Sequence, residues 1–268
     1  MSVALEARDI TKVYGHVSAL SGANFEVRTG EVTALIGDNG AGKSTLVRIL
    51  SGTETPTSGE ILVDGQPVTI DGPLTARRYG IETVYQDLAL APHLNPVQNM
   101  YLGREIMRPG LLGHLGFMNN ADMLVGSKKA FAELGATVRN FSGSIGAMSG
   151  GQKQAVAVAR AAAWAKRVIL LDEPTAALGV VQTKGVLDLI RRVRDRGLGV
   201  VFISHQMPSV LQVADEVQVM RLGRRVATFR AEDTTMEELV GAMTGAVTQD
   251  DVTQEAVLRE NGAQEKQS

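Results

Sequence analysis

The stretch Gly37-Asp38-Asn39-Gly40-Ala41-Gly42-Lys43-Ser44 decides the fold. It follows a short apolar segment, residues 31–36, and precedes a segment with helical periodicity that ends near Gly52. The glycines let backbone N–H groups curl around phosphate oxygens, and the start of a helix adds a partial positive charge. A chance match to G-x-x-x-x-G-K-[ST] occurs in on the order of 1% of chains this long. The sequence therefore predicts a phosphate-binding loop between a strand and a helix.

The side chains at and after this loop suggest chemistry on a nucleotide. Lys43 is expected to reach the β- and γ-phosphates, and the Ser44 hydroxyl is expected to hold Mg²⁺. Downstream, the apolar segment 168–171 ends in two carboxylates. We predict that Asp172 holds Mg²⁺ and that Glu173 polarises the attacking water as a general base. The alternative is an Asp-Glu-Pro turn that only ends a strand, and the upstream loop makes it the weaker interpretation.

Three single residues lie where strands are predicted to end. Gln86 could contact Mg²⁺ or the attacking water, and His205 could donate to the γ-phosphate. A lone Gln or His is more often an ordinary surface residue, but the edge at the carboxyl ends of strands is where α/β sheets bind ligands. The ring of Tyr14 could stack on adenine. Its alternative is a buried strand tyrosine.

A second anion-binding feature opens another predicted helix, at Ser149-Gly150-Gly151-Gln152. A Ser followed by two glycines leaves backbone N–H groups free at a helix start. Because the chain has two such features and one predicted metal site, we expect the second to serve a nucleotide held by another subunit. Two chains would then share two composite sites. An ordinary Ser N-cap is the alternative.

Composition excludes several classes of function. The chain has 268 residues, 44% of them apolar, and 27 basic against 29 acidic residues. This balance argues against nucleic acid as a partner, because binding a phosphate backbone needs excess Lys and Arg. No cysteine is present, so disulfides and thiolate metal sites are excluded. We expect no signal peptide and no membrane-spanning helix, which needs about 18–20 apolar residues.

The order of elements predicts an α/β fold. Alternation over the first 28 residues and the Asp64-Gly65 hairpin signal predict antiparallel strands. Strands separated by helices then predict a parallel sheet. Between Asp87 and Ala147 the β pattern fades, which predicts a mostly helical insertion with breaks at Gly103 and over 109–116. The expectation is a P-loop NTPase core with a mostly parallel sheet, an N-terminal antiparallel β subdomain and a helical subdomain insertion at about 87–160. Residues 1–245 would form this domain and 246–268 a polar, disordered tail.

The ordered set of motifs resembles an ABC-transporter ATPase subunit over about the first 245 residues. The resemblance implies that ATP and Mg²⁺ are bound, that Tyr14 stacks on adenine, and that Gln86 links the site to a membrane partner. It also implies that Glu173 is the general base and His205 a switch histidine. The residues that carry it are Tyr14, Gly37, Asp38, Asn39, Gly40, Ala41, Gly42, Lys43, Ser44, Thr45, Gln86, residues 148–152 and 168–174, and His205.

Finer features are similar to bacterial importers of simple sugars of the ribose, xylose and fructose type. They are residues 37–45, 176–179, 203–207 and the stretch 213–225. This likeness implies a permease, a second ATPase subunit and, indirectly, an extracytoplasmic sugar-binding protein, with the chain at the cytoplasmic face of the membrane. Residues 86–105 are the candidate surface for the permease. Two positions depart from the family: Gly179 replaces an Asp that helps shape the opposing site, and Met148 replaces Leu.

Other classes of function stay open at this point. Long insertions, a nucleic-acid-facing basic patch or a second ATPase half would favour a soluble ABC ATPase without a permease, and none of these is seen. Loss of Glu173 or Lys43 would favour a regulatory nucleotide-binding module, but both residues are present. An importer subunit for a non-sugar substrate and an exporter subunit are further alternatives.

Overall fold

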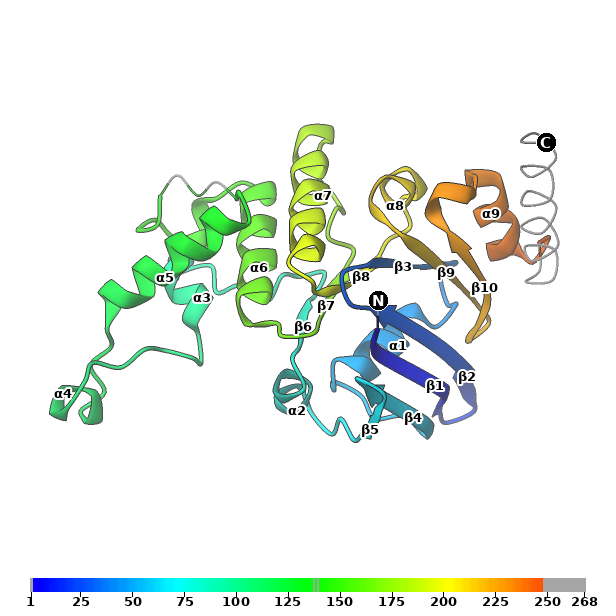
Figure 1. Ribbon diagram of the computed structural model, residues 1–268, viewed down its shortest axis with the longest axis horizontal. Helices are drawn as coiled ribbons and strands as arrows, with labels where there is room; N and C mark the ends of the chain where they lie inside the picture. The colour runs from blue at the N-terminus through cyan, green and yellow to red at the C-terminus, as the bar shows by residue number, and fades with distance from the viewer. Residues whose placement is uncertain (1, 137, 139, 248–268) are drawn as a thin grey trace, which may run out of the picture.

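Two sheets organise the computed structural model, which describes residues 2–136, 138 and 140–247 (Figure 1). The first has the strand order β2-β1-β4-β5 and is antiparallel. The second has the order β10-β9-β3-β8-β7-β6, and only β10 runs antiparallel to its neighbour. The predicted antiparallel and mostly parallel sheets are thus confirmed. The strands are β1 (Val3–Tyr14), β2 (Val17–Arg28), β3 (Val32–Gly37), β4 (Ser58–Val63), β5 (Gln66–Val68), β6 (Ile81–Val84), β7 (Val168–Asp172), β8 (Gly199–Ile203), β9 (Glu216–Arg221) and β10 (Arg224–Arg230).

Strict alternation along the parallel strands divides the apolar residues between two cores. Ala34, Ile36 and Phe202 face one core, whereas Leu35 and Ile203 face the other. All five side chains are buried. Burial on both faces is the rule for parallel sheets, because helices or other layers cover each side. The strands can therefore be apolar throughout, and their polar residues are left to the strand ends.

Helices cover these faces. One core contains α1 and the antiparallel sheet, and the other contains α6, α7, α8 and α9. The chain between β6 and β7 forms α3 to α6 at one end of the molecule, where α6 lies beside α7 (Figure 1). The helices are α1 (Lys43–Leu50), α2 (Pro73–Arg78), α3 (Pro96–Tyr101), α4 (Leu111–His114), α5 (Asn120–Glu133), α6 (Gly150–Trp164), α7 (Val180–Asp195), α8 (Met207–Val213) and α9 (Met236–Thr244), with 3₁₀ turns at Ile145–Ala147 and Ala231–Asp233.

The single tryptophan joins two of the helices in this part of the chain. Trp164 ends α6 and donates its indole N–H to the Met100 carbonyl of α3 at 2.9 Å. The Tyr101 ring meets it edge-on at 5.5 Å between centroids, and the Arg104 guanidinium lies 4.9 Å from the Trp164 ring centroid. Aromatic and cation–π contacts of this kind add to the apolar burial. The α3–α6 junction is therefore a well-packed contact.

Two details differ from the sequence-based expectation. Helix α2 was not predicted, because six residues after Gly72 carry too little periodicity to show it. A short helix, α4, lies inside the predicted break at 109–116. There Gly110 turns the chain with φ 71°, and its carbonyl accepts the N–H groups of Gly113 and His114. The break is therefore a one-turn helix. Most of the predicted tail, 248–268, lies outside the described residues.

Among the helices built from the described residues, none combines the length and the apolar character needed to cross a bilayer.

Candidate nucleotide site

Four neighbouring parallel strands bring the predicted site residues to one edge of the sheet. Strand β8 pairs with β3 on one side and with β7 on the other, and β6 lies beyond β7. In register, Ile203 lies opposite Leu35 and Asp172. The phosphate loop, Glu173 and His205 therefore leave the sheet at its carboxyl edge, where open α/β sheets bind ligands.

The phosphate loop ends at the start of α1 with Gly42 as N-cap, at φ 101°. A β-carbon at Gly42 would lie 2.8 Å from the Ala19 carbonyl oxygen and 2.7 Å from a Leu20 methyl, so only glycine fits this position. Within the described residues, no protein acceptor is bonded to the backbone N–H groups of residues 42–45. Such N–H groups at a helix start suit phosphate oxygens.

Lys43 lies across the same loop. Its Nζ donates to the carbonyl of Gly37 at 2.6 Å and to that of Asp38 at 3.0 Å. Burial lowers the pKa of Lys43, while the nearby carboxylates of Glu173, Asp38 and Asp172 act in the opposite direction. The structure thus brings Lys43 within electrostatic range of both carboxylates at the end of β7.

Asp172 is the last residue of β7, and its surroundings disfavour the ionised form of its carboxylate. Burial raises its pKa, the adjacent Glu173 raises it further, and Arg48 and Lys43 partly offset these effects. A cation bound there would relieve the repulsion. The Ser44 hydroxyl and the Asp172 carboxylate supply oxygen ligands of the kind that Mg²⁺ prefers, and Mg²⁺ usually takes the rest from phosphates and water. Ser44 and Asp172 therefore fit a magnesium ion held partly by a nucleotide.

Glu173 is held rigidly beside His205. Its backbone N–H donates to the Ile203 carbonyl at 3.0 Å, and its φ is 50°. One carboxylate oxygen, Oε1, lies 2.9 Å from Nδ1 of His205. The other, Oε2, is buried and has no hydrogen-bond partner among the residues that the structure describes. A fixed carboxylate with one free oxygen can accept a proton from water.

Gln86 and Tyr14 lie at or shortly after the end of a strand, as predicted. Gln86 is exposed, two residues after β6. Tyr14 ends β1 and is 39% exposed, so the alternative of a buried strand tyrosine is wrong. Lys12 Nζ lies 5.1 Å from the Tyr14 ring centroid. In the described part of the chain, no hydrogen bond joins either residue to the phosphate loop, and their predicted roles stay predictions.

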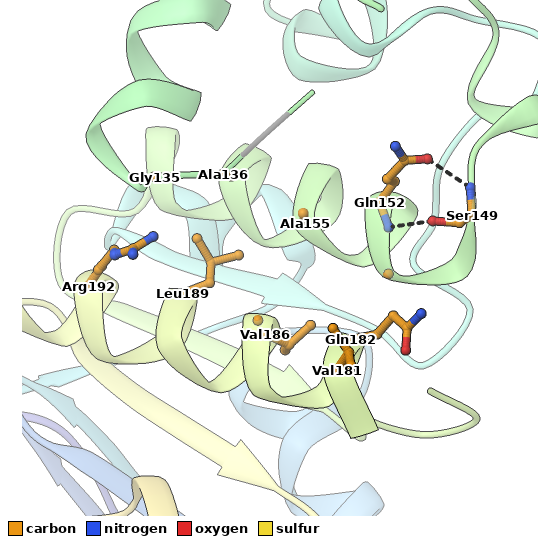
Figure 2. Close-up of a pocket in the computed structure, with 12 residues that line it drawn as sticks. Gly135, Ala136, Ser149, Gln152, Ala155, Val181, Gln182, Val186, Leu189 and Arg192 are labelled. Carbon is orange, nitrogen blue, oxygen red and sulfur yellow. Dashed lines mark hydrogen bonds between the residues drawn. The ribbon is translucent and has the colours of Figure 1, made fainter. Parts of the chain in front are cut away.

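The segment Ser149–Gln152 lies apart from the phosphate loop. It begins α6 with a capping box, in which Ser149 Oγ accepts from Gln152 N at 3.4 Å and Gln152 Oε1 accepts from Ser149 N at 3.0 Å. Figure 2 shows both side chains beside the start of α7, at a groove of about 400 Å³. Residues of the groove include Gly151, Gln182 and Val186, and none of residues 37–45. Ser149 is thus the N-cap of α6. The groove beside it does not include the phosphate loop of the same chain.

The sheet order, the loop and the carboxylate-ended strand define a nucleotide-binding ATPase of the P-loop class. Comparison with known proteins agrees. Residues 20–176 match the family described as ABC transporter. The chain belongs to the ABC transporter family, as its ATP-hydrolysing cassette.

Several relatives and a solved structure resemble the chain closely. The fructose import ATP-binding protein FrcA of Rhizobium meliloti is 49% identical over 90% of this chain and 94% of its own length. The xylose/arabinose import ATP-binding protein XylG of Sulfolobus acidocaldarius is 43% identical over 91% and 95%. A nucleotide-free ATP-binding cassette from an ABC transporter has a TM-score of 0.75 and 25% identity, covering 90% of this chain and 95% of that one. The predicted fold and family are therefore confirmed.

Proposed function

We propose that this chain is the ATP-hydrolysing subunit of an importer that couples ATP binding and hydrolysis to uptake of a simple sugar. The observation that carries hydrolysis is the free, buried Oε2 of Glu173, held beside a phosphate loop. The sugar assignment is supported by the relatives named for fructose and xylose/arabinose import.

The chemistry follows from the arrangement of the sheet edge. The N–H groups of residues 42–45 and the Lys43 ammonium bind the β- and γ-phosphates of ATP and offset charge that develops on them. Glu173 Oε2 accepts the proton of the attacking water, while His205 holds Oε1. Ser44 and Asp172, together with Gln86, would hold Mg²⁺, which would neutralise charge on the phosphates. No covalent intermediate is needed.

A second ATPase subunit completes the site in this proposal. Ser149, Gly150, Gly151 and Gln152 lie at the start of α6, and the groove beside them is lined by no residue of the phosphate loop of the same chain. Two copies that face one another would place each such segment on the other copy's ATP, while Tyr14 stacks on the adenine of its own. The complex would thus be a homodimer of ATPase subunits with two composite sites.

A membrane permease is the proposed partner of the α3 region. Residues 86–105 include the exposed Leu102, and the following loop exposes Ile106 and Met107. Exposed apolar side chains that cluster in this way mark interaction surfaces. The chain would then sit at the cytoplasmic face of the membrane, with an extracytoplasmic sugar-binding protein as an indirect partner and no role for nucleic acid. Residues 1–245 would form one ATPase domain, with a helical insertion at about 87–160.

Transport by a reconstituted complex tests the proposal. A permease that binds this chain would be placed with it in proteoliposomes, and ATP-dependent uptake of labelled fructose, xylose and ribose would be measured. Uptake that disappears with Glu173→Gln supports the proposal. Hydrolysis by a chain that binds no permease would favour a soluble ATPase, and transport of a non-sugar solute alone would overturn the sugar assignment.

A further inference from the structure

The turn between β9 and β10 touches the phosphate loop and the antiparallel sheet at the same time. The Gly223 N–H donates to the carbonyl of Ala41, inside the phosphate loop, at 3.0 Å. The carbonyl of the same residue accepts the N–H of Ser21, on β2, at 3.0 Å. The two peptide units that flank Gly223 therefore connect the phosphate loop with β2, two segments that are distant from this turn in the sequence.

The bridge has no space for a side chain. A β-carbon at Gly223 would lie 2.9 Å from the Ala19 carbonyl oxygen, 3.0 Å from Leu20 Cα and 3.2 Å from Ser21 N. All three are backbone atoms, so none can swing aside. The φ of Gly223 is 77°, in the left-handed region that favours glycine. Residues 19–20 of β2 also form the wall that Gly42 meets, so the same stretch of β2 packs against both glycines.

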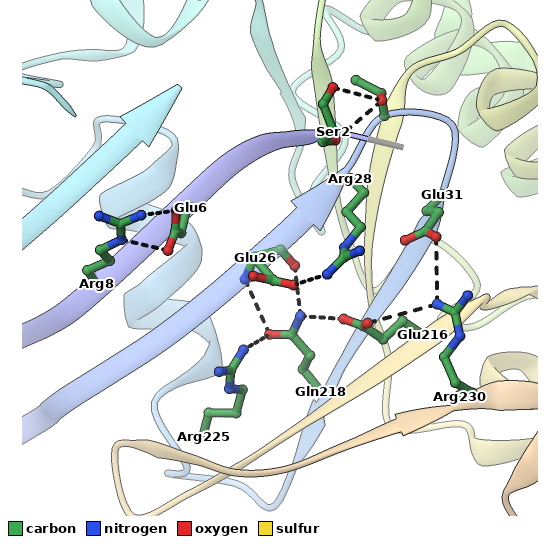
Figure 3. Close-up of polar contacts among 11 residues, drawn as sticks. Ser2, Glu6, Arg8, Glu26, Arg28, Glu31, Glu216, Gln218, Arg225 and Arg230 are labelled. Carbon is green, nitrogen blue, oxygen red and sulfur yellow. Dashed lines mark hydrogen bonds and ion pairs between the residues drawn. The ribbon is translucent and has the colours of Figure 1, made fainter. Parts of the chain in front are cut away.

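A second anchor fixes the hairpin further along β2. Gln218, fully buried on β9, accepts the Glu26 N–H at 3.3 Å and donates to the Glu26 carbonyl at 2.8 Å. Its amide also bonds Glu216 at 2.7 Å and Arg225 at 3.3 Å (Figure 3). Because β2 is the edge strand of its sheet, these bonds occupy backbone groups that would otherwise lack partners.

From this geometry we infer that Gly223 is a positioning residue for ATP, an inference that rests on the proposed function. Its two hydrogen bonds hold the phosphate loop at a fixed place relative to the sheet that carries Tyr14. ATP must meet the loop with its phosphates and that sheet with its adenine, so a displaced turn weakens ATP binding. Once ATP is bound, the pair Glu173 and His205, which follow β7 and β8, is unaffected.

The test compares two glycines with the same backbone strain. Gly65, in the β4–β5 turn, has φ 74° and nothing within 4 Å of its β-carbon position. Gly223→Ala and Gly65→Ala would be measured with wild type for the KM of ATP, kcat at saturating ATP and melting temperature. The expected result is a KM raised at least about fivefold in Gly223→Ala, since two hydrogen bonds are disturbed. Its kcat should stay within about twofold, and Gly65→Ala should change neither constant.

A KM rise of equal size in both variants would overturn the inference, because backbone strain or simple destabilisation would then explain it. An unchanged KM in Gly223→Ala would overturn it as well. If Gly223→Ala does not fold, hydrogen exchange of the wild type decides instead. A non-hydrolysable ATP analogue should slow exchange of the Gly223 and Ser21 N–H groups, and unchanged exchange overturns the inference. A wild type that neither binds nor hydrolyses ATP overturns the proposed function, and this inference with it.

Discussion

Glu173 Oε1 lies 2.9 Å from His205 Nδ1, and this contact joins the ends of two adjacent parallel strands. The Glu173 side chain is 15% exposed, whereas the His205 side chain is 66% exposed. One carboxylate oxygen is thus fixed by the histidine, and the other is buried without a hydrogen-bond partner in the described part of the chain. This arrangement supports the proposal that one oxygen positions the side chain while the other accepts a proton.

Replacing Glu173 by Gln should lower the rate of ATP hydrolysis by about 10²–10⁴-fold, the usual contribution of a general base. The amide keeps the size of the side chain but accepts no proton from water. Phosphate release and ATP affinity should both be measured, and the affinity should stay near that of wild type. Glu237→Gln, an exposed position on α9, is the matched control. Wild-type turnover in Glu173→Gln would rule out this residue as the base.

His205→Ala should reduce kcat less, by roughly 5- to 30-fold, because only the hydrogen bond that positions Glu173 is lost. In the Glu173→Gln background the same substitution should add little. This non-additivity is expected of residues that act as one unit. A double-mutant cycle on kcat measures it, and fully additive losses would show that the two residues act separately.

Lys43→Ala should weaken ATP binding by about 10- to 100-fold, since a charge-assisted contact with the phosphates is worth roughly 1.5–3 kcal/mol. Titration with a fluorescent ATP analogue measures this. Lys129→Ala is the control, as its side chain is 78% exposed and forms only a long ion pair on α5. Equal affinity in wild type and Lys43→Ala would contradict the placement of the phosphates over Lys43.

Asp172→Asn should stabilise the nucleotide-free protein at neutral pH while removing Mg²⁺-dependent hydrolysis. Burial and Glu173 raise the pKa of Asp172 above its ordinary value of 3.8, so the folded state disfavours the ionised form. The penalty is present at pH values above the raised pKa. It disappears as the pH falls below 3.8, where the group is protonated in both states. Urea unfolding of both proteins from pH 7 down to pH 4 measures the difference, which should shrink with falling pH.

Gly179→Asp should stabilise α7 by a few tenths of a kcal/mol. Gly179 is the N-cap of α7 and has φ −73°, which any residue adopts, and the structure records no side-chain cap there. Asp would accept a backbone N–H of the first turn, and Gln182 stands at the position that completes a capping box. The contact at 2.7 Å between a β-carbon and Gln182 Oε1 involves a flexible side-chain end. Denaturant unfolding measures the change, and a loss of stability would contradict it.

Local signals explain which parts of the fold could be predicted. The phosphate loop, the Asp64-Gly65 hairpin and the strand before Asp172 each lie within a few residues, so spacing and composition reveal them. Helix α2 was missed because it is short, and α4 because Gly110 conceals a single helical turn. The partners of Glu173 and Gly223 depend on strand order and register, which one sequence does not encode locally. Gly223 signals a turn, but nothing in the local sequence indicates a contact with Ala41.

The packing of Trp164 between α3 and α6 has a practical consequence for spectroscopy. Since it is the only tryptophan of the chain, all indole emission comes from the junction that leads from the proposed permease surface. The absence of cysteine means that one introduced thiol carries a dye with no background labelling. A quencher attached to such a thiol on the β9–β10 turn would then report, in real time, any change in the distance between the helical region and the phosphate loop when ATP binds.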